Sequence, residues 1–289
     1  MALTSVELTQ TLKGLVEQRK AYQDHPWIQR YIRGELSRAQ VRTWVEQHYC
    51  TVGDVHDLFG PIYAGCPDPE VRLKMLENLL EEETGRLTRS APHRELMCRL
   101  IEALGGTREQ ISQLRPLPET VARRSFMRLV ARTRPFYEAV ATISLAGESQ
   151  FGDMAETYAR TAETRYGLSP EATAFWWVHA EADKEHGGTA FDIVSHWART
   201  DAEQQQVIEA VRQSLELAWC WFDGFAGQPL SRLRKNPPFT LRQAQGERSR
   251  HCNCWRVAVR AEPVEARKRL FQHPVRAGFK HLLPSMLSF

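Results

Sequence analysis

Apolar residues recur every three or four positions along the first 230 residues of the chain, the spacing that places them on one face of an α-helix. The segments that show this pattern are 5–22, 38–59, 69–87, 93–104, 118–147, 152–165, 171–198 and 204–225. Strand-like alternation of apolar and polar residues is absent from this part of the sequence. The pattern therefore predicts one all-α domain over residues 1–230, with about seven to eight helices.

Helix-breaking residues separate these segments. We expect breaks at Asp24-His25-Pro26, Gly60-Pro61, Cys66-Pro67-Asp68-Pro69, Gly105-Gly106, Pro116 with Pro118, and Gly167-Leu168-Ser169-Pro170. Ser37 and Gln40 form a capping-box pattern, which predicts a helix start before Trp44. Ser169 and Pro170 predict another start, because Ser caps helices and Pro suits the first helical position.

Charge divides the chain into two parts. The whole chain has a net charge of +3, but residues 231–289 contain 13 Lys and Arg against three Glu, a net of +10. The remaining 25 basic and 32 acidic residues give residues 1–230 a net charge of −7, which argues against a specific nucleic-acid-binding domain. Residues 231–289 also lack a sustained period and resemble the translated product of a dispersed repeat element. We predict that they form a disordered or non-native tail; the alternative is a basic interaction arm.

Composition narrows the class of protein. The 289 residues are 42% hydrophobic and 25% charged, and no run of 18 apolar residues is present, so no membrane span is expected. The N-terminus lacks the basic and apolar pattern of a secretory signal. Six scattered cysteines are too few for a disulfide scaffold at this length. These features predict a cytoplasmic protein.

The densest group of reactive side chains lies in the segment 175–186. On a helix, His179, Asp183 and His186 have the spacing i, i+4, i+7 and fall within roughly 60° of one another. Phe175 and Trp176 lie on or near the same stripe, so this face is expected to point inward. Buried polar groups must be paired, and a bound metal would pair two imidazoles and a carboxylate. The alternative is a set of side chains that hydrogen-bond one another and the backbone.

Other helices contain further candidate ligands. Glu148 ends a long apolar run that begins at 136, and His93 opens the helix after Pro92. Among the three consecutive glutamates 81–83, Glu82 or Glu83 falls nearest the apolar stripe and Glu81 is less favoured. Helical bundles build two-metal sites from such residues, with Glu and His donated by facing helices.

The order Glu82, His93, Glu148, His179, Asp183, His186 resembles the heme-oxygenase-like di-iron oxidases. This family is related to thiaminase II and pyrroloquinoline-quinone synthase, and includes the Chlamydia protein associating with death domains. The resemblance covers about residues 1–228. It is also carried by the phrases His25-Pro-Trp27, Gly34-Glu-Leu36, Asn78-Leu-Leu-Glu-Glu-Glu-Thr-Gly85, Ala103-Leu-Gly105 and Trp219-Cys-Trp-Phe-Asp-Gly224.

The resemblance implies a heme-oxygenase-like helical bundle with two irons per chain, with manganese as the alternative metal. Glu82, His93 and His179 would hold one ion. Asp183 and His186 would hold the other, with Glu148 bridging or shared. One departure is Arg89, which stands where some relatives have a further ligand. The implied enzyme is an O2-dependent oxidoreductase that acts on a small amino-acid-like or carboxylate-bearing metabolite, with an external electron donor as a further partner and a homodimer as the assembly.

Several alternatives stay open on the sequence alone. A metal-free cofactor-biosynthesis oxidase of the quinone-synthase type, or a non-enzymatic binding protein, would share the fold. Arg134 and Arg165 could anchor a substrate carboxylate or simply lie on the surface. Exposed apolar residues in 204–225 are the single hint of a dimer. An aromatic set is expected to supply either core or pocket wall: Trp44, Tyr49, Phe59, Tyr63, Phe136, Tyr137, Phe175 and Trp176.

Overall fold

Helices account for most of residues 1–226, which are the residues that this computed structural model describes; within them, side chains are described everywhere except at 181–189. In this described part no strand is present, so the all-α prediction is confirmed. The predicted tail 231–289 lies outside the described residues. The elements are α1 (Ser5–Gln18), α2 (Ala21–Asp24), α3 (Pro26–Ile32), α4 (Arg38–Val52), α5 (His56–Gly65), α6 (Pro69–Thr84), α7 (His93–Ala103), α8 (Arg108–Ser112), α9 (Pro118–Thr133), α10 (Phe136–Val140), the π-helical segment η1 (Ala141–Glu148), α11 (Ser149–Tyr166), α12 (Ala174–Trp197) and α13 (Asp201–Phe225).

Side-chain caps explain where several helices begin, including α1, α4 and α13. The capping box of Ser37 and Gln40 is present at the start of α4, as predicted. The prediction that Ser169 caps a helical turn is confirmed, since its Oγ accepts the backbone N–H of Ala172 at 3.3 Å, but the regular helix α12 begins only at Ala174. Between them the chain forms turns, in which the Ser169 carbonyl accepts the backbone N–H of Thr173 at 3.1 Å. The Thr173 hydroxyl donates to Glu163 Oε1 at 2.7 Å and so connects these turns to α11.

One predicted break falls elsewhere, and one predicted helix is divided. α5 continues through Gly60-Pro61 to Gly65, and the chain turns instead at Gly53, where α4 ends. Burial of Phe59 and Ile62 in the core holds α5 together despite the hydrogen bond that Pro61 removes. The predicted helix 118–147 is divided at Arg134, which is extended because it precedes Pro135.

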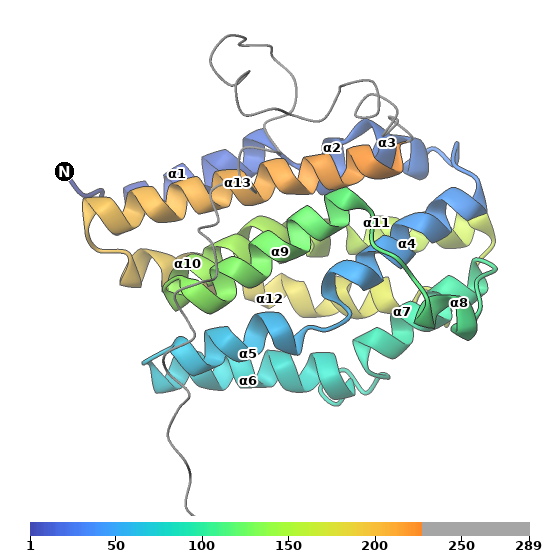
Figure 1. Ribbon diagram of the computed structural model, residues 1–289, viewed down its shortest axis with the longest axis horizontal. Helices are drawn as coiled ribbons and strands as arrows, with labels where there is room; N and C mark the ends of the chain where they lie inside the picture. The colour runs from blue at the N-terminus through green and yellow to red at the C-terminus, as the bar shows by residue number, and fades with distance from the viewer. Residues whose placement is uncertain (227–289) are drawn as a thin grey trace, which may run out of the picture. The chain divides into compact units, whose positions relative to one another are not determined.

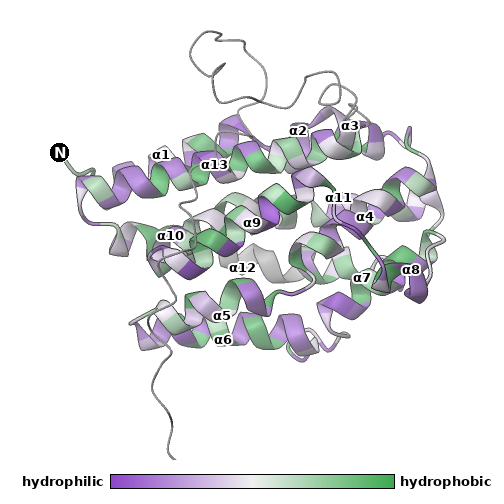
Figure 2. Ribbon diagram, in the orientation of Figure 1, coloured by the Kyte–Doolittle hydropathy of each residue, from purple (hydrophilic) through white to green (hydrophobic). Residues whose placement is uncertain are grey.

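The helices form pairs from both distant and neighbouring parts of the sequence. α1 lies along the distant α13, α5 lies along the next helix α6, and α9 and α12 run between these two pairs (Figure 1). Apolar residues gather on one side of most helices, as the green and purple faces in Figure 2 show. They form two core clusters, and the second is rich in aromatic side chains such as Trp27, Trp44 and Trp176. No helix in the described residues is apolar and long enough to cross a membrane.

The hint of a dimer in 204–225 is wrong, because α13 buries its large apolar residues. Val211, Leu215 and Trp221 are among the side chains of α13 that are at least 98% buried. Among the described residues, the exposed large apolar side chains lie elsewhere, including Leu73, Leu76 and Leu80 on α6. The homodimer therefore stays a prediction of the family resemblance alone.

Candidate metal centre

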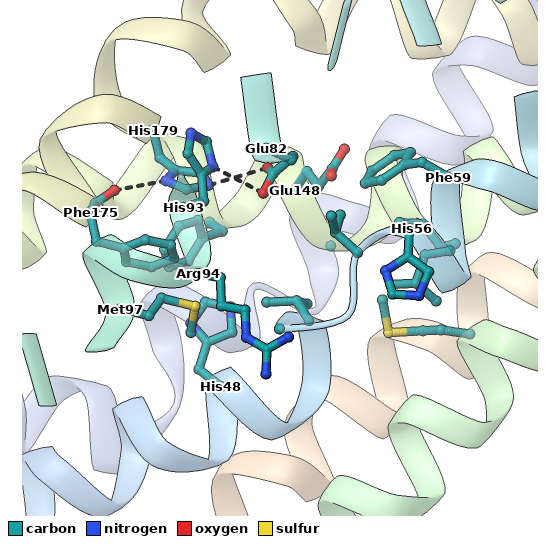
Figure 3. A pocket seen from close by; sticks show the side chains of 18 of the residues that line it. His48, His56, Phe59, Glu82, His93, Arg94, Met97, Glu148, Phe175 and His179 are labelled. Carbon is teal, nitrogen blue, oxygen red and sulfur yellow. Dashed lines mark hydrogen bonds and ion pairs between the residues drawn. The ribbon is translucent and has the colours of Figure 1, made fainter. Parts of the chain in front are cut away.

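Three side chains from three helices meet at the C-terminal end of α6. Glu82 is in the last turn of α6, His93 is the first residue of α7, and His179 lies on α12 (Figure 3). One ligand atom from each lies within 4.8 Å of the others. Glu82 Oε2 is 3.0 Å from His93 Nδ1, and Glu82 Oε1 is 3.9 Å from His179 Nε2. The Glu82 carboxylate therefore faces both imidazoles.

The loop between α6 and α7 is what positions His93. α6 ends at Gly85, whose φ of 63° is the left-handed conformation that glycine adopts without strain. A Cβ at this position would lie 2.5 Å from the Ala91 carbonyl oxygen, so the loop closes tightly against Gly85. This turn returns the chain to the start of α7 and places His93 beside the end of α6.

The three neighbouring glutamates have three different environments. Glu81 is buried and accepts hydrogen bonds from the backbone N–H groups of Leu87 and Thr88 at 2.6 and 3.3 Å, and from the Thr88 hydroxyl. Glu83 is half exposed and lies 3.7 Å from His56. Glu82 is the one directed at both imidazoles. The expectation that Glu81 is the least inward of the three is wrong, because this carboxylate is buried while it holds the loop after α6.

The orientation of His179 suits a ligand. Its Nδ1 lies 2.7 Å from the carbonyl oxygen of Phe175, one turn earlier on α12. With the proton on Nδ1, this nitrogen donates to the carbonyl, and Nε2 faces Glu82 with its lone pair. A backbone carbonyl behind the ring is the usual way in which proteins set the tautomer of a ligating histidine.

His93 provides the test of whether a metal fits here. Both of its ring nitrogens are buried, and neither has a hydrogen bond of acceptable geometry in the described residues. Its Nδ1 and Nε2 lie 3.0 and 3.5 Å from carboxylate oxygens of Glu82 and Glu81, contacts that lack hydrogen-bond angles. A cation would give one of these nitrogens a partner. Two imidazoles and a carboxylate form the donor set of non-heme iron sites, so the residues fit iron.

Glu82 and His93 shift the pKa of one another. Burial would raise the pKa of Glu82, but His93 and His179 outweigh it, and the pKa is lowered. Burial would likewise lower the pKa of His93, but the carboxylates of Glu82 and Glu81 raise it above its usual value. Glu82 is therefore held as the anion that a metal ligand has to be.

A cavity of about 280 Å³ opens beside these residues. Glu82, His93, His179 and Glu148 line it, together with apolar side chains that include Phe175 (Figure 3). Glu148 reaches this wall at the end of η1, where the chain changes from π-helical to α-helical winding. π-helical turns are uncommon and frequent at functional sites, because they rotate a side chain away from its α-helical direction.

The remaining candidates from the sequence have mixed outcomes. The side chains of Asp183 and His186 lie outside the described residues, although both positions belong to α12. Arg134 and Arg165 are exposed on the surface, so neither is placed to hold a ligand in the cavity. Of the eight aromatic candidates, Phe59 and Phe175 line the cavity.

Three further residues of the cavity wall were not predicted: Tyr22, His48 and Arg123. His48 and Arg123 are 7% and 5% exposed. The sequence contained a signal for His48 and for Arg123. His48 stands four residues after Trp44, and Arg123 stands three and four residues before Phe126 and Met127, so both interrupt the apolar stripe of a helix.

The pKa of His48 lies well below its usual value. Burial is the main cause, and the positive charges of Arg123 and of His179 when protonated add to it. The imidazole is thus neutral at physiological pH and packs edge-on against Phe151 and Phe175, with ring centroids 5.0 and 5.7 Å away.

Comparison with known proteins agrees with this picture. Residues 42–219 match the family model described as iron-containing redox enzyme. A 4-aminobenzoate synthase of Nitrosomonas europaea is 28% identical over 225 residues, which cover 74% of this chain and 89% of that protein. A pyrroloquinoline-quinone synthase of Acidiphilium cryptum is 27% identical and is matched over 69% of this chain and 80% of its own length.

A solved structure from Shewanella denitrificans, described as having a heme oxygenase-like fold, superposes with a TM-score of 0.62 at 15% identity. The match covers 82% of this chain and 98% of that chain. This similarity confirms the predicted heme-oxygenase-like fold.

Proposed function

This chain belongs to the family of iron-containing redox enzymes, and from that premise we propose that it is a non-heme di-iron oxidase that uses O2 to oxidise a small organic metabolite. The observation that carries the proposal is the buried group of Glu82, His93 and His179 on the wall of a cavity. These are the residue types that hold non-heme iron, and a cavity beside them leaves room for O2 and a substrate.

Under this proposal, Glu82, His93 and His179 would hold one iron. Asp183 and His186 would hold the second, and Glu148 would be shared. Support for the second ion comes from the position of Glu148 on the cavity wall and from the helical spacing of 183 and 186 after His179. Paired carboxylate and imidazole ligands from facing helices are the usual construction of such sites in bundles.

Two ferrous ions, when bound, would supply two of the four electrons that the reduction of O2 to water requires, and the substrate or an external donor would supply the other two. The chain contributes the surroundings. The anionic Glu82 offsets part of the metal charge, and the Phe175 carbonyl keeps the proton of His179 on Nδ1, away from the ligand position. Phe151 and Phe175 contact the His179 ring with centroids 5.1 and 4.6 Å away, and so keep bulk water from this side of the centre.

The substrate class is proposed to be a small carboxylate-bearing or amino-acid-like molecule. The cavity volume supports a small molecule, since sites for drug-sized ligands have about 300–1,000 Å³. The first similar protein above is named for making 4-aminobenzoate, which is itself an aromatic carboxylate.

Anaerobic loading of the full chain with Fe(II) tests the function. After desalting, iron is quantified and O2 uptake is followed with an electrode. We expect close to two irons per chain and O2 consumption that depends on them. Asp183→Asn should lower the content to about one iron while the helical content is unchanged, and Glu83→Gln, on the exposed neighbour of Glu82, serves as the matched control. No retained iron would contradict the proposal and favour the metal-free alternative of the quinone-synthase type.

A further inference from the structure

Arg123 is a buried cation whose hydrogen bonds are incomplete. It lies on α9 with 5% of its surface exposed. Its Nη2 donates to the hydroxyl of Tyr22 at 2.6 Å, whereas its Nη1 is buried with no hydrogen-bond partner. Within the described residues it forms no ion pair with a carboxylate. An unpaired buried charge is costly, so this arrangement calls for an anionic partner beyond the described side chains.

The surroundings of Arg123 are aromatic rather than acidic. Its guanidinium carbon lies 4.7 Å from the ring centroid of Trp221 and 5.4 Å from that of Tyr22. These cation–π contacts hold the side chain in place and stabilise its charge in part. They leave Nη1 without a hydrogen-bond partner, and the planar guanidinium is a group that binds carboxylates through parallel N–H donors.

Arg123 lines the same cavity as the candidate metal centre. A continuous set of ring contacts connects the two. His179 contacts Phe151 at 5.1 Å, Phe151 contacts His48 at 5.0 Å, and His48 contacts Trp221 at 5.7 Å, all measured between centroids. Trp221 in turn lies under the guanidinium of Arg123. Arg123 and the candidate metal centre thus line one cavity, and His48 and Phe151, which connect them, line it as well.

Space for a ligand beside the guanidinium is provided by Gly147. A Cβ on this residue would lie 3.8 Å from Nη2 of Arg123, with no nearer side-chain or backbone neighbour. Gly147 directly precedes Glu148 and also lines the cavity. The missing side chain therefore leaves room beside Arg123 on the wall to which Glu148 also belongs.

We infer that Arg123 is the specificity residue for the substrate and binds the carboxylate of a small organic acid whose apolar body lies along the aromatic wall toward the metal centre. The inference rests on the proposed function, because it names the substrate class of that same cavity. Arg123 takes the role of carboxylate anchor that the sequence offered to Arg134 and Arg165, whose side chains are exposed on the surface. A carboxylate supplies both the missing charge and the acceptor for Nη1.

Binding of matched acids and amides to the full chain tests the assignment. The probes are benzoate, phenylacetate and hexanoate, each paired with its neutral amide, and dissociation constants are measured by calorimetry with and without Fe(II). We expect at least one acid to bind about 10- to 100-fold more tightly than its amide, the range for a charged hydrogen-bonded pair. The preference should be present without iron, because the carboxylate binds at Arg123.

Variants identify the residue responsible. Arg123→Gln should remove the preference for the acid, and Arg165→Gln, which removes the same charge from the surface, should leave it unchanged. Gly147→Val should weaken acid binding while the contacts of Arg123 with Tyr22 and Trp221 are kept. This variant covers the case in which Arg123→Gln does not fold.

The outcomes separate this inference from the proposed function. Equal binding of acid and amide across the panel, or no binding of any probe, would overturn the role of Arg123 even if iron is retained. A preference that requires iron and survives Arg123→Gln would also overturn it, since the acid would then be a metal ligand. Loss of iron in Glu82→Gln with the acid preference unchanged would support both assignments at once.

Discussion

Replacing each of the glutamates 81–83 by glutamine separates a metal ligand from a residue that holds a loop. Glu81 accepts three hydrogen bonds from Leu87 and Thr88, whereas Glu82 faces the imidazoles. We expect Glu82→Gln to lose iron and to keep most of its stability. Glu81→Gln should lose stability first, and Glu83→Gln should change neither property.

The expected loss for Glu81→Gln follows from its contacts. Glutamine is nearly isosteric and retains one oxygen, but it is neutral, and charge-assisted hydrogen bonds are about twice as strong as neutral ones. With three bonds at a residue that is 6% exposed, we expect a loss of about 2 kcal/mol in the free energy of unfolding at pH 7. Burial alone would raise the pKa of Glu81, but the bonds from Thr88 and Leu87 outweigh it and lower the pKa. This contribution is therefore present above about pH 4.5 and is lost as the pH falls further.

Urea unfolding of the metal-free full chain measures the first property, and iron retained after desalting measures the second. Because the wild-type chain and all three variants are compared under the same conditions, iron and stability are read independently. The reasoning is refuted if Glu81→Gln loses iron at unchanged stability, or if Glu82→Gln retains its iron. The first result would move the ligand by one residue.

Three further effects follow from the described contacts. In metal-free protein, His48→Leu should remove an acid-sensitive component of the free energy of unfolding, because burial lowers the folded-state pKa of His48. Between pH 6 and pH 5, urea titrations should show the wild type losing about 1 kcal/mol more than the variant. Parallel curves for the two proteins would argue against a buried neutral imidazole. Bidentate pairing with Arg108 lowers the pKa of Glu95 to about 2 on a largely solvated surface, so Arg108→Gln should lower the free energy of unfolding by less than about 1 kcal/mol at pH 7. This difference should vanish as the pH falls from 4.5 toward 2. A difference that does not depend on pH would point to lost packing instead. Gly85→Ala should lower the free energy of unfolding by roughly 2 kcal/mol or more, since the new Cβ would lie 2.5 Å from the Ala91 carbonyl oxygen. The variant should also bind iron more weakly, because the loop after α6 is displaced. Unchanged thermal melting and iron content would contradict this role of the turn.

The helices of the domain follow from features that are local in the sequence. The capping box of Ser37, the cap at Asp68 and the apolar spacing act within one or two turns, so they can be read from the chain alone. Local signals fail where tertiary packing overrides them. Pro61 lies inside α5 because Phe59 and Ile62 are buried on both sides of it. No nearby residue in the sequence predicts this burial.

The sequence by itself indicated the chemistry of this protein: glutamates, histidines and an aspartate on several predicted helices, in an order that resembles an iron-dependent family. Only the tertiary structure decided which glutamate meets His93 and His179, because neighbouring positions on α6 differ by about 100° in direction, and the α6–α7 loop selects between them. Contacts between α9 and distant helices likewise decided that Arg123, rather than Arg134 or Arg165, lies in the cavity. A charge on a helix has the same local pattern whether it meets solvent or an aromatic wall, so its role depends on which elements the fold brings against it.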